Sequence, residues 1–209
     1  MPFAPTPVFD KRYNGFLFDM DGTLLNSIAA AERVWSIWAE RHGLEVATFL
    51  TTIHGARAID TITRQALPGV DPEIEAQWIA EAEINDVEGV VAISGAVEFL
   101  NRLPGEQWAL VTSAPRELAL RRLQAAGITP PAVLVTAEDV AIGKPDPACY
   151  QLGAQRLGQQ RFVFANEGGG AHADGVVVAW AVDSGRRRVM RVPSPGRLYQ
   201  WQCAAAPWA

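Results

Sequence analysis

The sequence lacks the features that mark secreted and membrane-spanning chains. Its 209 residues include only two cysteines, Cys149 and Cys203, which excludes a disulfide framework and favours a reducing compartment. No apolar run approaches the ~18 residues that a membrane-spanning helix needs, and residues 1–12 lack the apolar stretch of a signal peptide. These absences predict a cytoplasmic globular protein that does not bind membranes.

Positive charge is also scarce. The chain has 18 basic and 23 acidic residues, and the net charge of −5 disfavours nucleic-acid binding through a basic surface. Lysine is especially rare, because only Lys11 and Lys144 are lysines and the other 16 basic residues are arginines. Nucleic acid is therefore not expected as a partner.

Leucine and isoleucine are nearly absent from the last quarter of the chain. Residues 1–158 contain 26 of them, whereas residues 159–209 contain only Leu198. The charge changes at nearly the same place, from a net −8 in residues 1–160 to a net +3 in residues 161–209. Residues 159–209 are therefore an atypical part of the chain.

Short apolar runs alternate with helical patterns along most of the sequence. Strands that alternate with helices favour a parallel sheet with helices on both faces, so the predicted fold class is α/β with a Rossmann-like parallel sheet core. The predicted strands are Gly15–Asp19, Trp108–Thr112, Ala132–Thr136 and Phe162–Ala165, with a weakly marked strand at Arg188–Val192. Further helices are predicted at Ala96–Leu103, before the second strand, and at Pro115–Ala126 and Pro147–Leu157.

About 70 residues between the first two strands show helical patterns and no convincing strand. A crossover between parallel strands needs only one helix and short loops, so residues 27–92 are predicted to form an inserted helical domain. This domain would lie over the carboxyl end of the first strand, and residues 1–26 and 93–209 would form the α/β core. Its helical patterns are Ile28 to His42, Thr48–Ile53, Ala58–Ala66 and Pro72–Asp86.

Two acids stand at the end of the first predicted strand, in Asp19-Met20-Asp21-Gly22-Thr23. Side chains two residues apart point to the same side of a strand, so these carboxylates would converge at the sheet edge where ligands bind in open α/β folds. Two nearby carboxylates repel unless a cation neutralises them or one is protonated, and Mg²⁺ suits such a pair. By itself, the motif fits a turn with two solvated acids equally well.

Two further motifs follow other strands. Thr112 and Ser113 precede a helix, where hydroxyl and backbone N–H groups can hold phosphate, although a plain helix N-cap is the commoner explanation of such a pair. Lys144, in Gly-Lys-Pro-Asp-Pro at residues 143–147, is either an exposed loop lysine or a cation for a carboxylate–phosphate pair. The binding interpretation is favoured because parallel strands bring all three motifs to one edge.

Asp-x-Asp-Gly-Thr, a strand-ending Thr-Ser and Gly-Lys-Pro-Asp-Pro, in this order, resemble the haloacid dehalogenase-like hydrolase superfamily. The inserted helices resemble the cap of its phosphatase branch. Residues 16–27 (Phe-Leu-Phe-Asp-Met-Asp-Gly-Thr-Leu-Leu-Asn-Ser) are similar to small sugar-phosphate phosphatases, among them 2-deoxyglucose-6-phosphate and glycerol-phosphate phosphatases, with β-phosphoglucomutase as a relative. The resemblance extends from Tyr13 to Gly158 and implies an Mg²⁺-dependent phosphatase that acts on a small sugar or polyol phosphate.

The resemblance also implies a role for each motif residue. Asp19 would be the nucleophile that forms an aspartyl-phosphate, and Asp21 would protonate the leaving alcohol and later activate water. Thr112 and Ser113 would hold the phosphate, and Lys144 would stabilise the charge that develops during transfer. The dehalogenase members lack the second acid, so its presence favours phosphoryl transfer.

The predicted cap adds two candidates for substrate binding, His54 and Arg57. The family places such a loop over the site, where Arg57 would clamp a hydroxyl or a second charge; a capping histidine and a helix-surface arginine explain the pair equally well. Trp35 and Trp38, three residues apart, are interpreted as cap core rather than as a platform that stacks on a sugar.

The fourth motif of the family differs in this chain. The family carries two adjacent acids after the next strand, one of which binds the metal, whereas Asn166 and Glu167 stand here. Glu167 is the acid that would complete a Mg²⁺ site with Asp19 and Asp21, and Asn166 would be a weak neutral ligand. One hypothesis is that the reading frame changes near Gly158; a genuinely divergent terminus is the rival.

Two alternative functions stay open from the sequence. A catalytically impaired protein would bind a phosphorylated ligand through Thr112, Ser113 and Lys144 without turnover. A phosphomutase would return the phosphoryl group to the sugar instead of to water. A monomer or weak dimer is expected.

Overall fold

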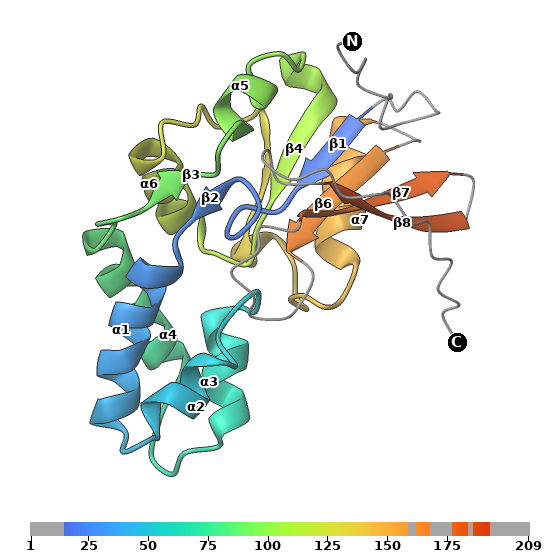
Figure 1. Cartoon of the computed structure of the whole chain (residues 1–209). Helices are drawn as coiled ribbons and strands as arrows, with labels where there is room; N and C mark the ends of the chain where they lie inside the picture. The colour runs from blue at the N-terminus through green and yellow to red at the C-terminus, as the bar shows by residue number, and fades with distance from the viewer. Residues whose placement is uncertain (1–14, 159–161, 168–176, 184–185, 193–209) are drawn as a thin grey trace.

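A computed structural model describes residues 15–158, 162–167, 177–183 and 186–192, and a six-stranded sheet lies at the centre of this part of the chain (Figure 1). The strands are β1 (Gly15–Phe18), β4 (Trp108–Val111), β5 (Val133–Val135), β6 (Phe162–Glu167), β7 (Val177–Asp183) and β8 (Arg186–Val192). Their order across the sheet is β5-β4-β1-β6-β7-β8. The first four in this order are parallel, and β7 and β8 extend the sheet in antiparallel pairing.

The sheet confirms the predicted α/β fold. The register places Phe18 at the end of β1 between Leu110 of β4 and Ala165 of β6, so these parallel strands end at one edge. The weakly marked strand at Arg188–Val192 is part of β8. β7 was not predicted, although its valine-rich run has high strand propensity.

Helices cover both faces of the parallel strands. Neighbouring side chains in a strand point to opposite faces of the sheet, and in these strands both faces carry apolar side chains. One face packs against α7 (Ala148–Leu157) and the other against α6 (Arg116–Ala125), near α5 (Ala96–Leu100). Burial on both faces accounts for the continuous apolar runs of these strands. The first face buries Leu17, Ala109, Val111 and Val135, and the second buries Phe18, Leu110 and Leu134.

Four of the helices between β1 and β4 form a segment with a separate apolar core (Figure 1). This helical segment contains α1 (Ile28–Arg41), α2 (Val46–Leu50), α3 (Ala58–Gln65) and α4 (Pro72–Asn85). Its buried aromatic residues are Trp35, Trp38 and Phe49, whose rings contact one another. Within the described residues, no helix is long and apolar enough to cross a bilayer.

A short two-stranded sheet joins the helical segment to the core. β2 (Leu25–Asn26) enters the segment and β3 (Val91–Ala92) leaves it, and the two pair in antiparallel register. Residues 27–92 were expected to contain no strand, and this prediction is wrong for the last two of them, which form β3. Two residues are too few to show the alternation on which strand prediction depends.

A carboxylate ties the loop after β5 to both flanking helices. Asp139, at the end of the 3₁₀ turn η2 (Ala137–Asp139), accepts hydrogen bonds from the Thr136 amide and hydroxyl at 2.9 and 3.0 Å. Arg156 of α7 and Arg116 of α6 donate to the same carboxylate at 2.6 and 3.3 Å. This loop leads to Lys144, so the contacts help to fix the start of that segment.

Replacement of Trp38 by alanine is expected to lower the free energy of unfolding by about 3–5 kcal/mol, because a fully buried aromatic side chain would leave a cavity. Urea unfolding followed by circular dichroism measures this loss. Ile37→Ala is the matched control, since Ile37 is the preceding residue of α1 and is 56% exposed; a change within about 0.5 kcal/mol is expected. Equal losses in the two variants would contradict the described core.

The carboxylate of Asp139 predicts a pH-dependent contribution to stability. Burial alone would raise its pKa, but the hydrogen bonds from Arg156 and Thr136 outweigh this effect and lower the pKa from 3.8 to about 2. A lowered pKa stabilises the fold above the unfolded-state value, and this stability disappears as the pH falls towards the folded-state value. Asp139→Asn should therefore lower the free energy of unfolding by about 1–2 kcal/mol at neutral pH, and by progressively less below pH 3.8. A pH-independent loss in urea titrations would argue against a charge effect.

Candidate active site

The carboxyl end of β1 presents a buried carboxylate in a tight turn. The carbonyl of Met20 accepts hydrogen bonds from the amides of Thr23, Leu24 and Leu25 at 2.9–3.2 Å. Gly22 has a φ of 73°, a left-handed conformation that glycine adopts without a steric cost. The turn holds Asp19 at 6% exposure, with its Oδ1 atom accepting from the amide of Met20 at 2.8 Å.

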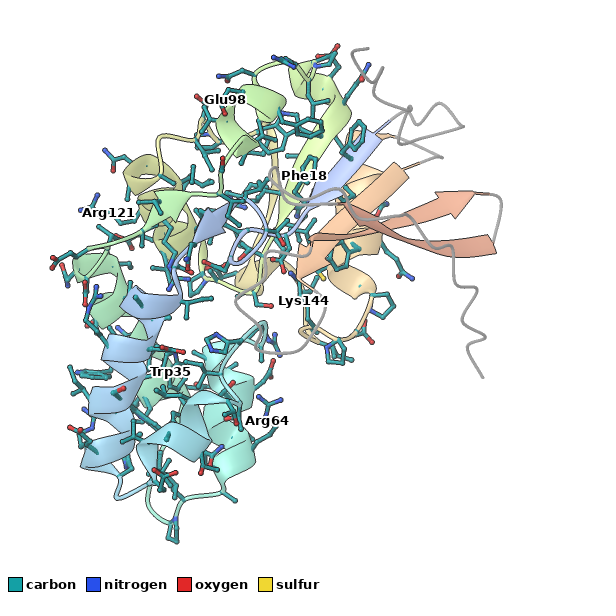
Figure 2. The ribbon with its side chains drawn as sticks, viewed as in Figure 1. Phe18, Trp35, Arg64, Glu98, Arg121 and Lys144 are labelled. Atoms are coloured by element: carbon teal, nitrogen blue, oxygen red, sulfur yellow. The ribbon has the colours of Figure 1, made fainter. Side chains whose placement is uncertain are left out.

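Lys144 supplies a positive charge for this buried carboxylate. Its Nζ atom lies 2.6 Å from Oδ1 of Asp19 and donates to the carbonyl of Val111, at the end of β4, at 3.0 Å. Burial raises the pKa of the Asp19 carboxyl and the nearby Asp21 adds to the rise, whereas the Lys144 ammonium opposes it. Figure 2 shows Lys144 at the sheet edge that faces the helical segment.

The end of β4 places two hydroxyl groups at the same edge. Thr112 is buried, and its Oγ1 atom accepts from the amide of Ala114 at 3.1 Å, which leaves its proton available for an anion. Ser113 donates through Oγ to the carbonyl of Gly55, in the helical segment, at 2.9 Å. The second hydroxyl therefore connects the sheet edge with the loop that covers it.

Asp21, a half-buried acid, is linked to two buried charges. Its Oδ1 atom accepts from the Ser27 hydroxyl at 2.6 Å and from Nη1 of Arg122 at 3.0 Å. Nη2 of the same arginine donates to Oε1 of Glu83 in α4, also at 3.0 Å. The side chains of Arg122 and Glu83 are only 7% and 9% exposed. One guanidinium group thus joins the β1 turn to the helical segment.

These residues surround a cavity of about 80 Å³ between the sheet edge and the helical segment. Asp19, Asp21, Thr112, Ser113 and His54 all line it. The structure thereby brings together five of the predicted site residues, and Lys144 contacts one of them directly. Arg122, Glu83 and Ser27 add further polar groups to the lining, and Trp35 adds an aromatic ring.

The remaining predicted residues lie differently. Nε2 of His54 lies 3.4 Å from a carboxylate oxygen of Glu32, inside the helical segment. Arg57 is not among the lining residues; it forms two hydrogen bonds to Asp60, at 2.7 and 2.8 Å, and one to the carbonyl of Val140 at 3.1 Å. Its guanidinium therefore contacts the loop before Lys144. The structure describes the main chain of Glu167, at the end of β6, but not its side chain.

Sequence reasoning missed Arg122 and Glu83. A signal for both was present, since each stands one helical turn after a buried apolar residue. Arg122 follows Leu118 by four positions and Glu83 follows Ile79 by four, so each lies on the buried face of its helix. A charged residue at a buried helical position needs a partner, and these two are partners.

The described part of the site offers carboxylate ligands for a hard divalent cation, but not a complete set of them. Asp19, Asp21 and Glu83 carry three carboxylates around the cavity against the two cations Lys144 and Arg122, so a bound phosphate would leave a large excess of negative charge. Carboxylate oxygens are the ligands that Mg²⁺ prefers. Among the described residues, no group of three His, Cys, Asp or Glu side chains is placed to hold a metal ion. A third acidic ligand would come from the end of β6.

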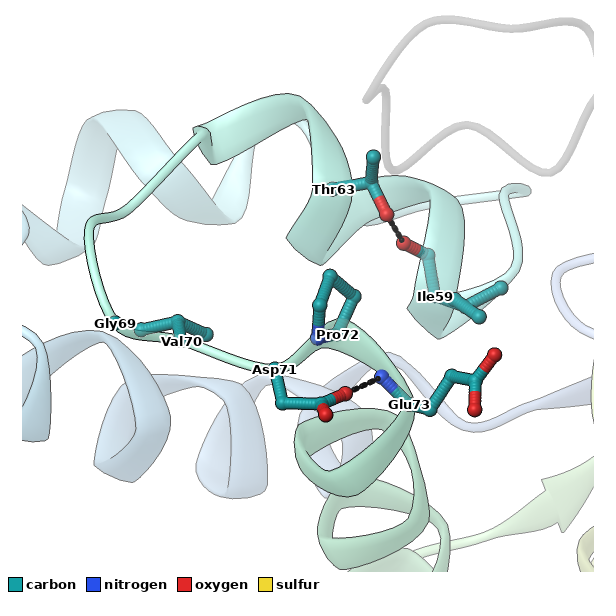
Figure 3. Close-up of a pocket in the computed structure, with 7 residues that line it drawn as sticks. All are labelled: Ile59, Thr63, Gly69, Val70, Asp71, Pro72 and Glu73. Carbon is teal, nitrogen blue, oxygen red and sulfur yellow. Dashed lines mark hydrogen bonds between the residues drawn. The ribbon is translucent and has the colours of Figure 1, made fainter.

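A second hollow, of about 690 Å³, lies on the surface of the helical segment (Figure 3). Its polar groups bond within its own wall: the Thr63 hydroxyl donates to the carbonyl of Ile59 at 2.7 Å, and the Glu73 amide donates to Asp71 at 2.9 Å. None of the predicted site residues lines it. The lining residues are Ile59, Thr63, Gly69, Val70, Asp71, Pro72 and Glu73.

Comparisons with known proteins give one consistent family. A family model described as haloacid dehalogenase-like hydrolase matches residues 13–165. Hexitol phosphatase A of Escherichia coli is 44% identical over 151 residues, which cover 70% of this chain and 70% of that protein. Glycerol-1-phosphate phosphohydrolase 2 of Saccharomyces cerevisiae is 32% identical over 157 residues, which cover 73% of this chain and 63% of that protein. A crystal structure of a hydrolase from Pseudomonas syringae has a TM-score of 0.60 at 25% identity, over 69% of this chain and 70% of that one.

Replacement of Lys144 by methionine is expected to raise the pKa of the Asp19 carboxyl further. The variant loses the attraction and the hydrogen bond of the ammonium group, whereas the effect of burial persists. A pH titration of the carboxyl ¹³C resonance of Asp19, in buffer with EDTA, measures the shift. Arg121→Met, at an exposed position of α6, is the control and should leave the titration unchanged. An unchanged titration in Lys144→Met would contradict the ion pair.

Proposed function

Because the chain belongs to the haloacid dehalogenase-like hydrolases, in the branch of the sugar-phosphate phosphatases, we propose that it hydrolyses a small sugar or polyol phosphate with Mg²⁺ as cofactor. The observation that carries this proposal is the convergence of Asp19, Asp21 and Thr112 on one cavity, with Lys144 bonded to the first of them. An attacking carboxylate, a second carboxyl group, a hydroxyl donor and a cation are the parts that phosphoryl transfer through an aspartate requires.

In the first step, Asp19 attacks the phosphorus atom and the bond to the leaving alcohol breaks. Its Oδ1 atom is already held by Lys144 and by the amide of Met20, so Oδ2 is the oxygen that forms the aspartyl-phosphate. Asp21 donates a proton to the leaving oxygen. Thr112 and Lys144 stabilise the negative charge on the phosphoryl oxygens in the transition state.

In the second step, water hydrolyses the aspartyl-phosphate. Asp21, which has lost its proton, accepts one from the attacking water. Asp19 leaves as a carboxylate next to Lys144, whose ammonium group lies 2.6 Å away and stabilises the restored charge. The pair of acids then has the protonation states with which the cycle began.

The proposed Mg²⁺ ligands are the Asp19 carboxylate, the main-chain carbonyl of Asp21 and the carboxylate of Glu167. The carbonyl of Asp21 is preferred to that of Met20, which already accepts three backbone hydrogen bonds. When bound, the ion would neutralise charge on the phosphoryl oxygens and reduce repulsion between phosphate and carboxylates. The assignment of Glu167 comes from its position at the end of β6, the strand next to β1.

The lining of the cavity and the relatives support the proposed substrate class. Beyond the phosphate-binding edge, the lining offers His54, whose imidazole suits a hydroxyl group of a polyol or sugar. Hexitol and glycerol phosphates, named for the two relatives, are the first substrates to test. Arg57, whose guanidinium bonds to Asp60 and Val140 in this structure, would need to leave these partners to touch a substrate. The cytoplasmic location and the monomeric or weakly dimeric state stay predictions.

Mg²⁺-dependent phosphate release should be measured with hexitol phosphate, glycerol 1-phosphate and 2-deoxyglucose 6-phosphate. Asp19→Asn is expected to lower kcat by at least about 10³-fold, because the amide is not a nucleophile, and EDTA should abolish release. Asp86→Asn is the control, since Asp86 pairs with Arg33 on the surface of the helical segment, and its activity should match that of the unchanged protein.

Two results would contradict the proposal, and each identifies an alternative. Binding of the phosphorylated compounds without turnover would indicate an impaired protein that keeps only the ligand site. Conversion of a sugar phosphate into its isomer without phosphate release would indicate a phosphomutase.

A further inference from the structure

Arg122 is the most deeply buried charged side chain at the site that the proposed chemistry does not use. Its side chain is 7% exposed, on the face of α6 that packs against the β1 turn and α4. Burial alone would lower the pKa of its guanidinium, but the carboxylates of Asp21 and Glu83 raise it, so the group stays charged. A buried permanent charge is costly, and the structure keeps this one beside Asp21.

The contacts of Arg122 distinguish the two oxygen atoms of Asp21. Nη1 of Arg122 and the hydroxyl of Ser27 both donate to Oδ1, at 3.0 and 2.6 Å. When this carboxyl group is protonated, its proton lies on Oδ2, because Oδ1 already accepts two hydrogen bonds. The arrangement therefore fixes both the orientation of the side chain and the oxygen that meets the substrate.

Glu83 fixes the orientation of the guanidinium plane of Arg122. Oε1 of Glu83 accepts from Nη2 of Arg122 at 3.0 Å, and the carboxylate is 9% exposed within α4. Two acids that bind two different nitrogens of one planar group define its position and its rotation. A lysine, with one compact ammonium group, cannot make this pair of contacts in the same geometry.

We propose that Arg122 is a positioning residue, anchored by Glu83, that holds Asp21 through Oδ1 so that Oδ2 faces the leaving oxygen of the substrate. This inference rests on the proposed function. In the step concerned, a bond forms between Asp19 and phosphorus, the bond from phosphorus to the leaving oxygen breaks, and the proton of Oδ2 moves to that oxygen. Arg122 touches neither phosphorus nor the leaving group.

The inference predicts an effect that depends on the leaving group. An alcohol is a poor leaving group and needs the proton, whereas 4-nitrophenolate departs without one. The ratio kcat/KM covers the steps up to departure of the leaving group and excludes the later hydrolysis. Loss of Arg122 should therefore lower kcat/KM for glycerol 1-phosphate, or for the best alkyl phosphate found, and spare that for 4-nitrophenyl phosphate.

The experiment compares the two substrates in three variants. Arg122→Met should lower kcat/KM for the alkyl phosphate by about 10- to 100-fold, part of what a well-placed general acid contributes, and change that for 4-nitrophenyl phosphate by less than about threefold. Arg122→Lys keeps the charge and supports folding, and should give an intermediate loss on the alkyl phosphate alone. Arg121→Met, at the exposed neighbouring position, should leave both values unchanged.

The ratio of the two kcat/KM values does not depend on how much of a variant is folded, so partial unfolding does not obscure the result. Equal losses on both substrates in Arg122→Met and Arg122→Lys would overturn the inference and leave the proposed function intact. Unchanged values on both substrates would also overturn it. Failure of the unchanged protein to hydrolyse either substrate would overturn the proposed function and this inference together.

Discussion

The site depends on the pairing of carboxylates with cations at the edge of a buried sheet. Asp19, Asp21 and Glu83 lie around one small cavity, and Lys144 and Arg122 contact them at 2.6–3.0 Å. Removal of one partner from a buried ion pair typically costs about 3–5 kcal/mol. The surrounding structure must therefore hold each cation in place beside its carboxylate. α6 carries Arg122, and the loop before α7 carries Lys144. One positive charge therefore comes from the helix on one face of the sheet, and the other from the loop that leads into the helix on the opposite face.

Much of this arrangement is predictable from short stretches of sequence. Asp19, Thr112 and Lys144 each stand close after an apolar run or between a strand and a helix, and parallel strands bring such positions to one edge. The fold follows from the same alternation, because the strands are buried on both faces and appear as continuous apolar runs. The aromatic core of the helical segment is likewise visible in the spacing of Trp35 and Trp38.

Other features depend on contacts between distant parts of the chain. Arg122 and Asp21 are 101 positions apart, and Arg122 and Glu83 are 39 apart. Arg122 and Glu83 are each conspicuous on the buried face of a helix, but nothing local in the sequence identifies their partners. Arg57 shows the opposite case: its place in the sequence fitted substrate binding and a helix-surface position equally well, and the structure pairs it with Asp60, three residues later, and with Val140. Local spacing predicts where an arginine lies better than what it contacts.

The pairing of β2 with β3 has a consequence for how this kind of enzyme diversifies. Leu25 lies opposite Ala92, so the chain leaves the core and returns to it at adjacent points. Whatever lies between these points is a cassette: it can be lengthened, shortened or exchanged while the distance that its ends must span stays the same. Asp19, the proposed nucleophile, and Lys144, which pairs with it, belong to the core, whereas much of the cavity wall beyond them belongs to the cassette. Selectivity can therefore evolve by replacement of one insert, with the reaction itself inherited unchanged.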